Sequence, residues 1–85
     1  MDISRAEQRI LHLLAQGGRI DLIRNDNRKI EALRLITREG WVFYGLDLET
    51  FRKLKHKKAV SSRNGQPYRI TERGLFLVRA QQDNC

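Results

Sequence analysis

Four turn signals divide this 85-residue chain into segments long enough only for short helices and strands. They are Gly17-Gly18, Asn25-Asp26-Asn27, Arg38-Glu39-Gly40 and Asn64-Gly65. Glycine and asparagine favour tight turns because both reach positive φ at little steric cost. A chain of this length forms one small hydrophobic core, so we predict a single domain over residues 1–85.

The first segment has the pattern of a capped amphipathic helix. Ser4 and Glu7 form a capping box, which predicts a helix over residues 5–16. One arc of its helical wheel is apolar and faces the expected core. That arc consists of Ala6, Ile10, Leu13 and Leu14, with Leu11 at its edge. Gly17-Gly18 then supplies the left-handed residue at which the helix ends.

Three short strands are predicted next, at residues 19–24, 29–37 and 41–44. Their apolar side chains alternate imperfectly and point to both faces of the sheet, so both faces require cover, which a chain of 85 residues can fall short of supplying. The last strand holds three aromatic residues, Trp41, Phe43 and Tyr44. They could stack on nucleic-acid bases, but we expect them to pack in the core, where a small domain needs large apolar groups.

A basic helix and a hairpin follow. Asp47 is the expected N-cap of a helix that ends near Lys58, and Asn64-Gly65 closes a hairpin within residues 59–71. Pro67 fits the start or the edge of a strand. Helix followed by hairpin is the order of elements at the binding end of a winged helix. We therefore predict a small α+β, winged-helix-like domain: helix, three-stranded sheet, basic helix, β-hairpin wing and short C-terminal helix.

The final helix should begin after Thr71 and cover residues 72–80. Its block Leu75-Phe76-Leu77-Val78 is apolar on every side, which indicates either deep burial or a surface shared with a partner. We prefer an interface there. The alternative is that Phe76 fills the core beneath the first helix.

The positive charge is concentrated in one part of the sequence. Eight of the 17 Lys and Arg residues lie within residues 52–73, where Glu72 is the only acid, so this window carries the chain's whole net charge of +7. Such a patch predicts an anionic partner, nucleic acid first. The candidate contact residues are Arg52, Lys53, His56 and Lys57 on the helix and Arg63 and Arg69 on the hairpin. An acidic protein surface would satisfy the same patch.

The sequence does not favour catalysis. It contains no metal-ligand spacing and no nucleophile–base pair within one element, and Gly17-Gly18 follows a helix where a phosphate-binding loop would precede one. We expect a non-enzymatic protein without catalytic residues, metal or cofactor. The alternative is that His56 assists phosphodiester cleavage, as histidine does in small ribonucleases.

The expected location is the cytoplasm. Cys85 is the only cysteine, which agrees with a reducing compartment. No apolar run approaches the ~18 residues of a membrane span, and the N-terminus lacks a signal-peptide pattern. We therefore expect no membrane partner.

Several stretches, taken in order, form a family pattern. They are Ser4-Arg5, Glu7-Gln8-Arg9, His12, residues 14–20, 38–40, 51–58, 64–71 and 78–81, and Asp83-Asn84. Together they resemble the YjhX family of small bacterial proteins over nearly the whole chain. The resemblance implies the toxin of a toxin–antitoxin pair that binds and inhibits bacterial DNA topoisomerase I, with an acetyltransferase-like antitoxin as partner. It implies no particular site residues.

These observations combine into one functional hypothesis with two alternatives. The first is a non-enzymatic toxin that inhibits a DNA-processing enzyme through the basic helix and wing. The second is a winged-helix transcriptional regulator that binds DNA. The third is a small ribonuclease toxin. The oligomeric state stays open.

Overall fold

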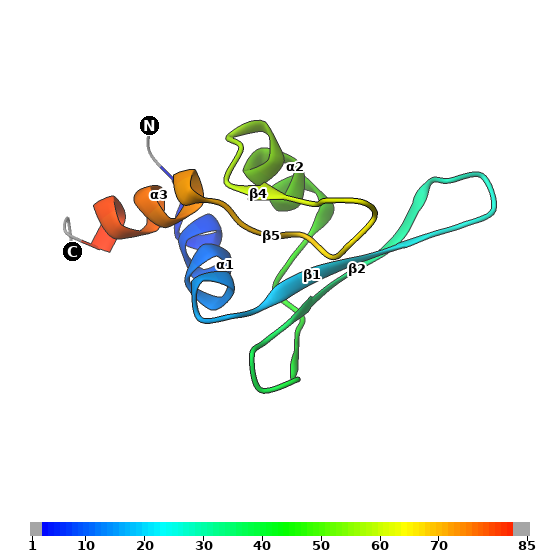
Figure 1. Ribbon diagram of the computed structural model, residues 1–85, viewed down its shortest axis with the longest axis horizontal. Coiled ribbons are helices and arrows are strands. Elements are labelled where there is room, and N and C mark those ends of the chain that lie inside the picture. Colours follow the sequence, from blue (N-terminus) through cyan, green and yellow to red (C-terminus); the bar gives the residue numbers. More distant parts are fainter. Residues whose placement is uncertain (1–2, 83–85) are drawn as a thin grey trace.

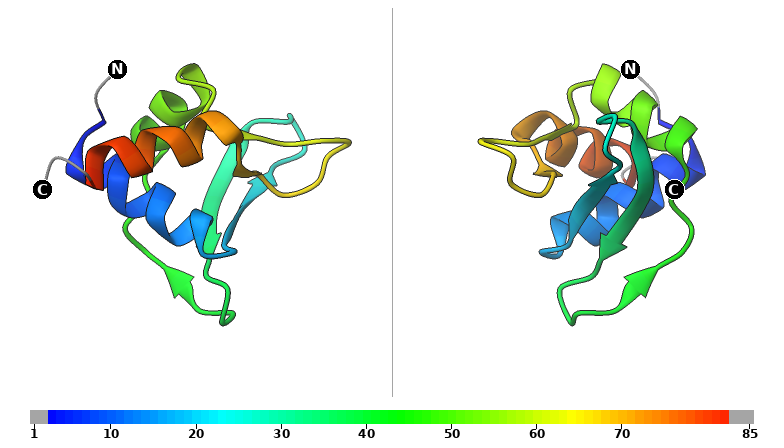
Figure 2. Two further views of the ribbon diagram at one scale, coloured as in Figure 1. Left: turned by 60° about the vertical axis from the view of Figure 1, so that its left-hand side comes forward. Right: turned by 90° about the vertical axis from the view of Figure 1, so that its right-hand side faces the viewer.

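Three helices lie together on one side of a small antiparallel sheet in the computed structural model, which describes residues 3–82 (Figures 1 and 2). The elements are α1 (Arg5–Ala15), β1 (Arg19–Arg24), β2 (Ile30–Ile36), β3 (Val42–Phe43), α2 (Leu48–His56), β4 (Val60–Ser61), β5 (Arg69–Ile70) and α3 (Glu72–Gln82). This confirms the α+β class and the predicted order of elements.

The two sheets are joined at one residue of β1. Strands β1, β2 and β3 pair antiparallel in that order, and β4 pairs with β5. We call the hairpin of residues 60–70 the wing. Ile20 and Tyr68 exchange two backbone hydrogen bonds of 2.9 and 2.8 Å, which connect the wing to the outer edge of β1. The β1–β2 hairpin extends past this contact and reaches the end of the molecule opposite α3 (Figure 1).

The core lies between the helices and one face of the sheet. Its fully buried large side chains are Ile10, Leu11, Ile20, Leu35, Phe51 and Leu54. Tyr68 of the wing packs edge-on against Phe51, with ring centroids 5.0 Å apart. No described element covers the opposite face, where Ile23 is exposed and Ile36 and Val42 are half-buried. Residues 3–82 therefore leave this apolar face of the sheet without cover.

The predicted apolar arc of α1 was correct in part. The buried positions are Glu7, Ile10, Leu11 and Leu14, whereas Ala6 is exposed and Leu13 is half-buried. A pattern of apolar residues cannot identify Glu7 as buried, because a carboxylate is buried only where it gains hydrogen bonds or an opposite charge.

Two of the three clustered aromatics are on the surface. Trp41 is 74% exposed and Tyr44 is 89% exposed, so the expectation that they pack in the core was wrong. Phe43 alone turns inward, where its ring lies over Gly45 and beneath the Arg9 guanidinium, 5.4 Å away. Strand β3 contains only two residues and lies at the sheet edge. Trp41 and Tyr44, which flank it, therefore have no strand or helix packed over them among the described residues.

Helices α1 and α2 end with the same backbone motif. Gly17 and Gly18 donate to the carbonyls of Leu14 and Leu13, and Gly17 has a φ of 114°. In α2, Lys58 and Ala59 donate to Lys55 and Leu54. Both are Schellman motifs followed at once by a hairpin, so the chain repeats a helix-then-hairpin unit. The second unit places Lys58, at a φ of 60°, where the first has glycine.

The wing turn and the start of α3 match the predicted local signals. Asn64 and Gly65 have φ values of 52° and 75°, as two-residue hairpin turns of the primed type require. The Thr71 hydroxyl accepts a hydrogen bond of 3.0 Å from the Gly74 backbone and caps α3. The segment between α1 and α2 forms strands, so α2 has no helix-turn-helix partner there. The likeness to a winged helix therefore stays a prediction.

We expect Gly74→Ala to destabilise the protein, although alanine is the better helix former by about 1 kcal/mol. A Cβ at this position would overlap the carbonyl oxygen of Ala59 and touch the Ile70 side chain. Overpacking of this kind costs about 1–3 kcal/mol. Denaturant unfolding measures the change, and a variant more stable than wild type would show that α3 is not packed this closely.

Truncation should change the free energy of unfolding little at Phe76 and strongly at Leu77. Phe76 is 64% exposed and Leu77 is 3% exposed. We expect Phe76→Ser to change unfolding free energy by only about 0.5 kcal/mol and Leu77→Ser to cost at least about 3 kcal/mol. Equal losses of stability in the two variants would indicate that Phe76 packs in the core. Sedimentation of wild type and Phe76→Ser tests whether Phe76 mediates self-association.

Candidate binding surface

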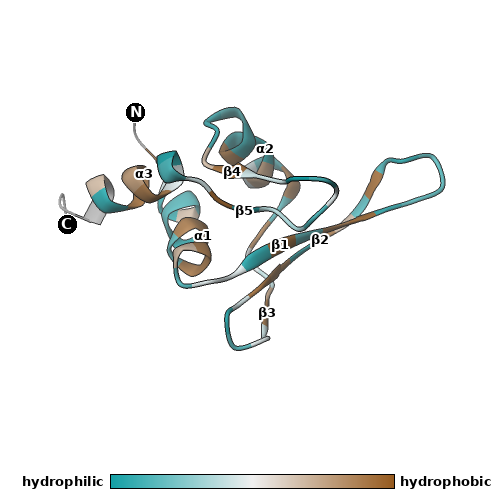
Figure 3. Ribbon diagram, viewed as in Figure 1, coloured by the Kyte–Doolittle hydropathy of each residue, from teal (hydrophilic) through white to brown (hydrophobic). Residues whose placement is uncertain are grey.

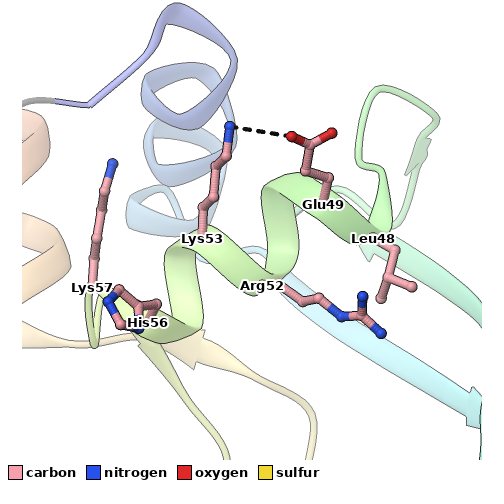
Figure 4. Close-up of a pocket in the computed structure, with 6 residues that line it drawn as sticks. All are labelled: Leu48, Glu49, Arg52, Lys53, His56 and Lys57. Carbon is pink, nitrogen blue, oxygen red and sulfur yellow. Dashed lines mark ion pairs between the residues drawn. The ribbon is translucent and has the colours of Figure 1, made fainter.

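Helix α2 presents its basic side outward because its apolar side chains are fully buried. Phe51 and Leu54 are 0% exposed, which turns Arg52, Lys53 and His56 to the surface. We call these three residues the α2 face. They border a shallow hollow of about 530 Å³ along the helix (Figure 4). Its lining residues are Leu48, Glu49, Arg52, Lys53, His56 and Lys57.

Both ends of α2 are fixed by side chains. At the N-terminus the Asp47 carboxylate accepts a hydrogen bond of 2.7 Å from the Thr50 backbone. Hydrogen bonds from the Thr50 side chain and backbone lower the pKa of Asp47. At the C-terminus two groups from the start of α3 donate to the last carbonyls. The Arg73 guanidinium donates to Lys57 over 2.8 Å, and the Thr71 hydroxyl donates to Lys58 over 2.7 Å. The orientation of the α2 face therefore depends on α3.

The side chains of the α2 face are accessible to a partner. Arg52 and His56 are exposed. Lys53 forms an ion pair of 3.4 Å with Glu49, one turn earlier, and both side chains are more than half exposed (Figure 4). Exposed pairs of this kind contribute little to stability, so an anionic partner can take over Lys53 at small cost.

Lys57 differs from the other candidates on the helix because it forms an ion pair with a buried carboxylate. Its ammonium lies 2.7 Å from a Glu7 carboxylate oxygen, and the two side chains are 18% and 4% exposed. Glu7 also accepts a hydrogen bond of 3.0 Å from the Ser4 backbone, which completes the capping box of α1. Lys57 therefore connects α2 to α1, and its role in partner binding stays a prediction.

The two wing candidates also differ. Arg63 is exposed beside the turn of the wing. The Arg69 guanidinium donates hydrogen bonds of 3.1 and 3.3 Å to the carbonyls of Gly17 and Gly18. It thus satisfies the C-terminus of α1 and joins β5 to it. Its contribution to a binding surface stays a prediction, because these contacts already hold the side chain in place.

Sequence reasoning missed two further cations, Lys55 and Lys58. The Lys55 ammonium lies 5.6 Å from the ring centre of Phe51 and 5.7 Å from that of Tyr68, within range of cation–π attraction. Lys58 is exposed in the left-handed conformation. The spacing of Phe51 and Lys55 by four residues could have indicated the first contact. Nothing in the sequence indicated the conformation of Lys58.

The surface presents groups that can bind an anion. Among residues 3–82 no group of three or more His, Cys, Asp or Glu side chains is placed to hold a metal ion. His12 lies on α1, where its Nε2 is 3.2 Å from the Gln16 side-chain amide, and His56 lies on α2. The site instead combines exposed guanidinium, ammonium and imidazole groups on a rigid helix.

Comparison with known proteins identifies the family. The family model described as "Putative toxin of bacterial toxin-antitoxin pair", YjhX_toxin, matches residues 1–85. This chain belongs to the YjhX toxin family. Membership assigns it to the toxin side of such a pair and implies an antitoxin partner.

Named relatives of this YjhX-family chain align along its whole length. A UPF0386 protein of Agrobacterium fabrum is 71% identical and one of Rhizobium rhizogenes is 70% identical, each over 99% of both chains. A UPF0386 protein of Hyphomonas neptunium is 62% identical over 100% of both chains. No solved structure matches the chain. Within the described residues, no helix has the length and apolar character needed to cross a bilayer.

We expect Lys57→Met to destabilise the YjhX-family chain by about 3 kcal/mol at neutral pH, because it leaves the Glu7 carboxylate buried without this ammonium. Lys53→Met removes the exposed pair with Glu49 and is the matched control. Its cost should be at most about 0.5 kcal/mol. Similar losses in the two variants, measured by denaturant unfolding, would contradict a structural role for Lys57.

The stability gap between wild type and Lys57→Met should close in acid. Burial alone would raise the pKa of Glu7, but hydrogen bonds from Lys57 and Ser4 outweigh it, so the pKa lies below the ordinary value of 4.5. A carboxylate with a lowered folded pKa stabilises the protein fully above its unfolded pKa and loses that effect as pH falls through the folded one. A gap that stays constant from neutral pH to well below 4.5 would exclude ionised Glu7 as the cause.

Proposed function

We propose that this YjhX-family chain is a non-enzymatic toxin that binds and inhibits a DNA-processing enzyme through the α2 face and the wing. DNA topoisomerase I is the target that the family resemblance implies. The observation that carries the proposal is the α2 face itself. Arg52, Lys53 and His56 are held outward on a helix whose opposite side is fully buried and whose two ends are capped.

The charge of this surface limits how it can inhibit. An enzyme groove that holds DNA is normally cationic, so a cationic protein does not fit it as a mimic of DNA. The α2 face is suited instead to an acidic region of the enzyme, or to the phosphates of DNA while the enzyme is bound to it. Guanidinium groups such as that of Arg52 recognise carboxylate and phosphate equally well through paired hydrogen bonds.

A DNA-binding regulator is the second candidate. The arrangement that favours it is an outward basic helix followed by a wing with exposed Arg63. Lysine and arginine supply affinity for phosphate more readily than choice of sequence, and the α2 face has no Asn, Gln or Ser to select bases. Such binding would be strongly dependent on salt and weakly dependent on sequence.

Reversal of charge on the proposed surface tests the function. We expect Arg52→Glu/Arg63→Glu to weaken inhibition of DNA topoisomerase I in plasmid relaxation by at least about tenfold, since opposed charges at an interface repel. Arg5→Glu/Arg79→Glu makes the same change in net charge on exposed residues of α1 and α3 and serves as the control. The control variant should inhibit as well as wild type.

The outcomes separate the three hypotheses. Equal inhibition by the two double variants would move the binding surface elsewhere. The regulator would be favoured if the protein retards a DNA duplex in a gel but inhibits the enzyme no more than an unrelated DNA-binding protein does. Cleavage of RNA that His56→Ala abolishes would overturn the non-enzymatic assignment and favour the ribonuclease.

A further inference from the structure

Part of the outer edge of β1 has no pairing strand. Along β1, Ile20 directs its backbone groups to Tyr68 of the wing, and Asn25, just beyond the strand, directs its N–H to Lys29 across the β1–β2 hairpin. Because these directions alternate along a strand, the N–H and C=O of Leu22 and the N–H of Arg24 face the wing side. No backbone hydrogen bond within residues 3–82 pairs these groups.

The wing does not continue the ladder beyond Tyr68. Gln66, two positions before Tyr68, is the wing residue whose backbone would face Leu22 in a continued ladder. The backbone of Gln66 is already used within the wing, since its N–H donates to Arg63 over 2.9 Å and its carbonyl accepts from the Ser62 hydroxyl. The ladder between β1 and the wing therefore stops at Ile20 and Tyr68, and the edge at Leu22 and Arg24 stays open.

A cleft lies between this open edge and the wing. Its volume is about 500 Å³. Its walls are Ile20, Asp21, Leu22 and Arg24 from β1, and Ser62, Gly65, Gln66, Pro67 and Tyr68 from the wing. In Figure 1 the β1–β2 hairpin runs beneath the wing loop and continues beyond it, so a segment lying along β1 would enter from the hairpin tip. Figure 3 shows that the tip and the wing turn are hydrophilic.

The charges around the cleft favour an acidic occupant. The end of β1 and the following turn carry three exposed cations, Arg24, Arg28 and Lys29, against one acid, Asp26. On the wing side Arg63 is exposed next to Ser62. The only acid that lines the cleft, Asp21, forms an ion pair of 3.3 Å with Arg19.

We propose that this open edge of β1 is a docking site for an extended, acidic segment of a partner protein, which adds as a strand beside Leu22 and Arg24. Strand addition uses the unpaired backbone groups of an edge for affinity and neighbouring side chains for selectivity. A nucleic acid cannot form such a ladder, which favours a protein segment. The proposal concerns a surface other than the α2 face and does not rest on the proposed function.

The test uses a synthetic peptide of alternating threonine and glutamate, about ten residues long, the upper length of ordinary strands. Titration of the ¹⁵N-labelled protein should shift the amides of Leu22 and Arg24 and slow their hydrogen exchange. Arg24→Pro removes the outward N–H, and Arg24→Ala removes the same side chain but keeps that N–H. We expect the proline variant to bind about fivefold more weakly than the alanine variant, the factor that one net hydrogen bond contributes.

A second variant keeps the test independent of how well the proline variant folds. Arg24→Glu/Arg28→Glu should lose the acidic peptide and bind a threonine–lysine peptide instead. Equal binding by Arg24→Pro and Arg24→Ala, when both give folded spectra, would overturn strand addition. So would absence of binding by wild type, amide shifts confined to the α2 face, or an oligothymidine that perturbs Leu22 and Arg24 where the peptide does not.

Discussion

The ion pair between Glu7 and Lys57 joins the two helices on which the binding surface depends. Glu7 serves the first turn of α1 as half of its capping box and meets Lys57 where α2 ends. A carboxylate 96% removed from water is tolerated only with such partners. At the same end of α2, the Thr71 hydroxyl donates to the Lys58 carbonyl and the Arg73 guanidinium donates to the Lys57 carbonyl. Thr71 is the cap of α3 and Arg73 lies in its first turn. Loss of the pair would therefore loosen all three helices where they meet.

Most of the fold could be predicted because it depends on local sequence signals. The site was harder to predict because it depends on contacts between residues far apart in the sequence. Capping by Ser4 and the turn at Asn64-Gly65 depend on residues within a few positions, so their elements were predicted with small errors at the ends. Lys57 meets a carboxylate 50 positions earlier, and Arg69 meets carbonyls 51 and 52 positions earlier. A charge pattern cannot distinguish such structural cations from exposed ones like Arg52.

The wing has two different sides in this arrangement. Arg63 is exposed beside the turn of the wing, and Ser62 and residues 65–68 wall the cleft along β1. Because Tyr68 both packs on Phe51 and pairs with Ile20, the wing is mechanically coupled to α2 and to β1. An occupant of either surface would restrain the same hairpin.

Helix α3 contributes to two separate parts of the fold. Leu77 and Val78 belong to the core, and Thr71 and Arg73 close the end of α2. Local unfolding of α3 would remove both contributions at once, because the same short segment supplies them. The rigidity of the α2 face is therefore linked to the local stability of α3.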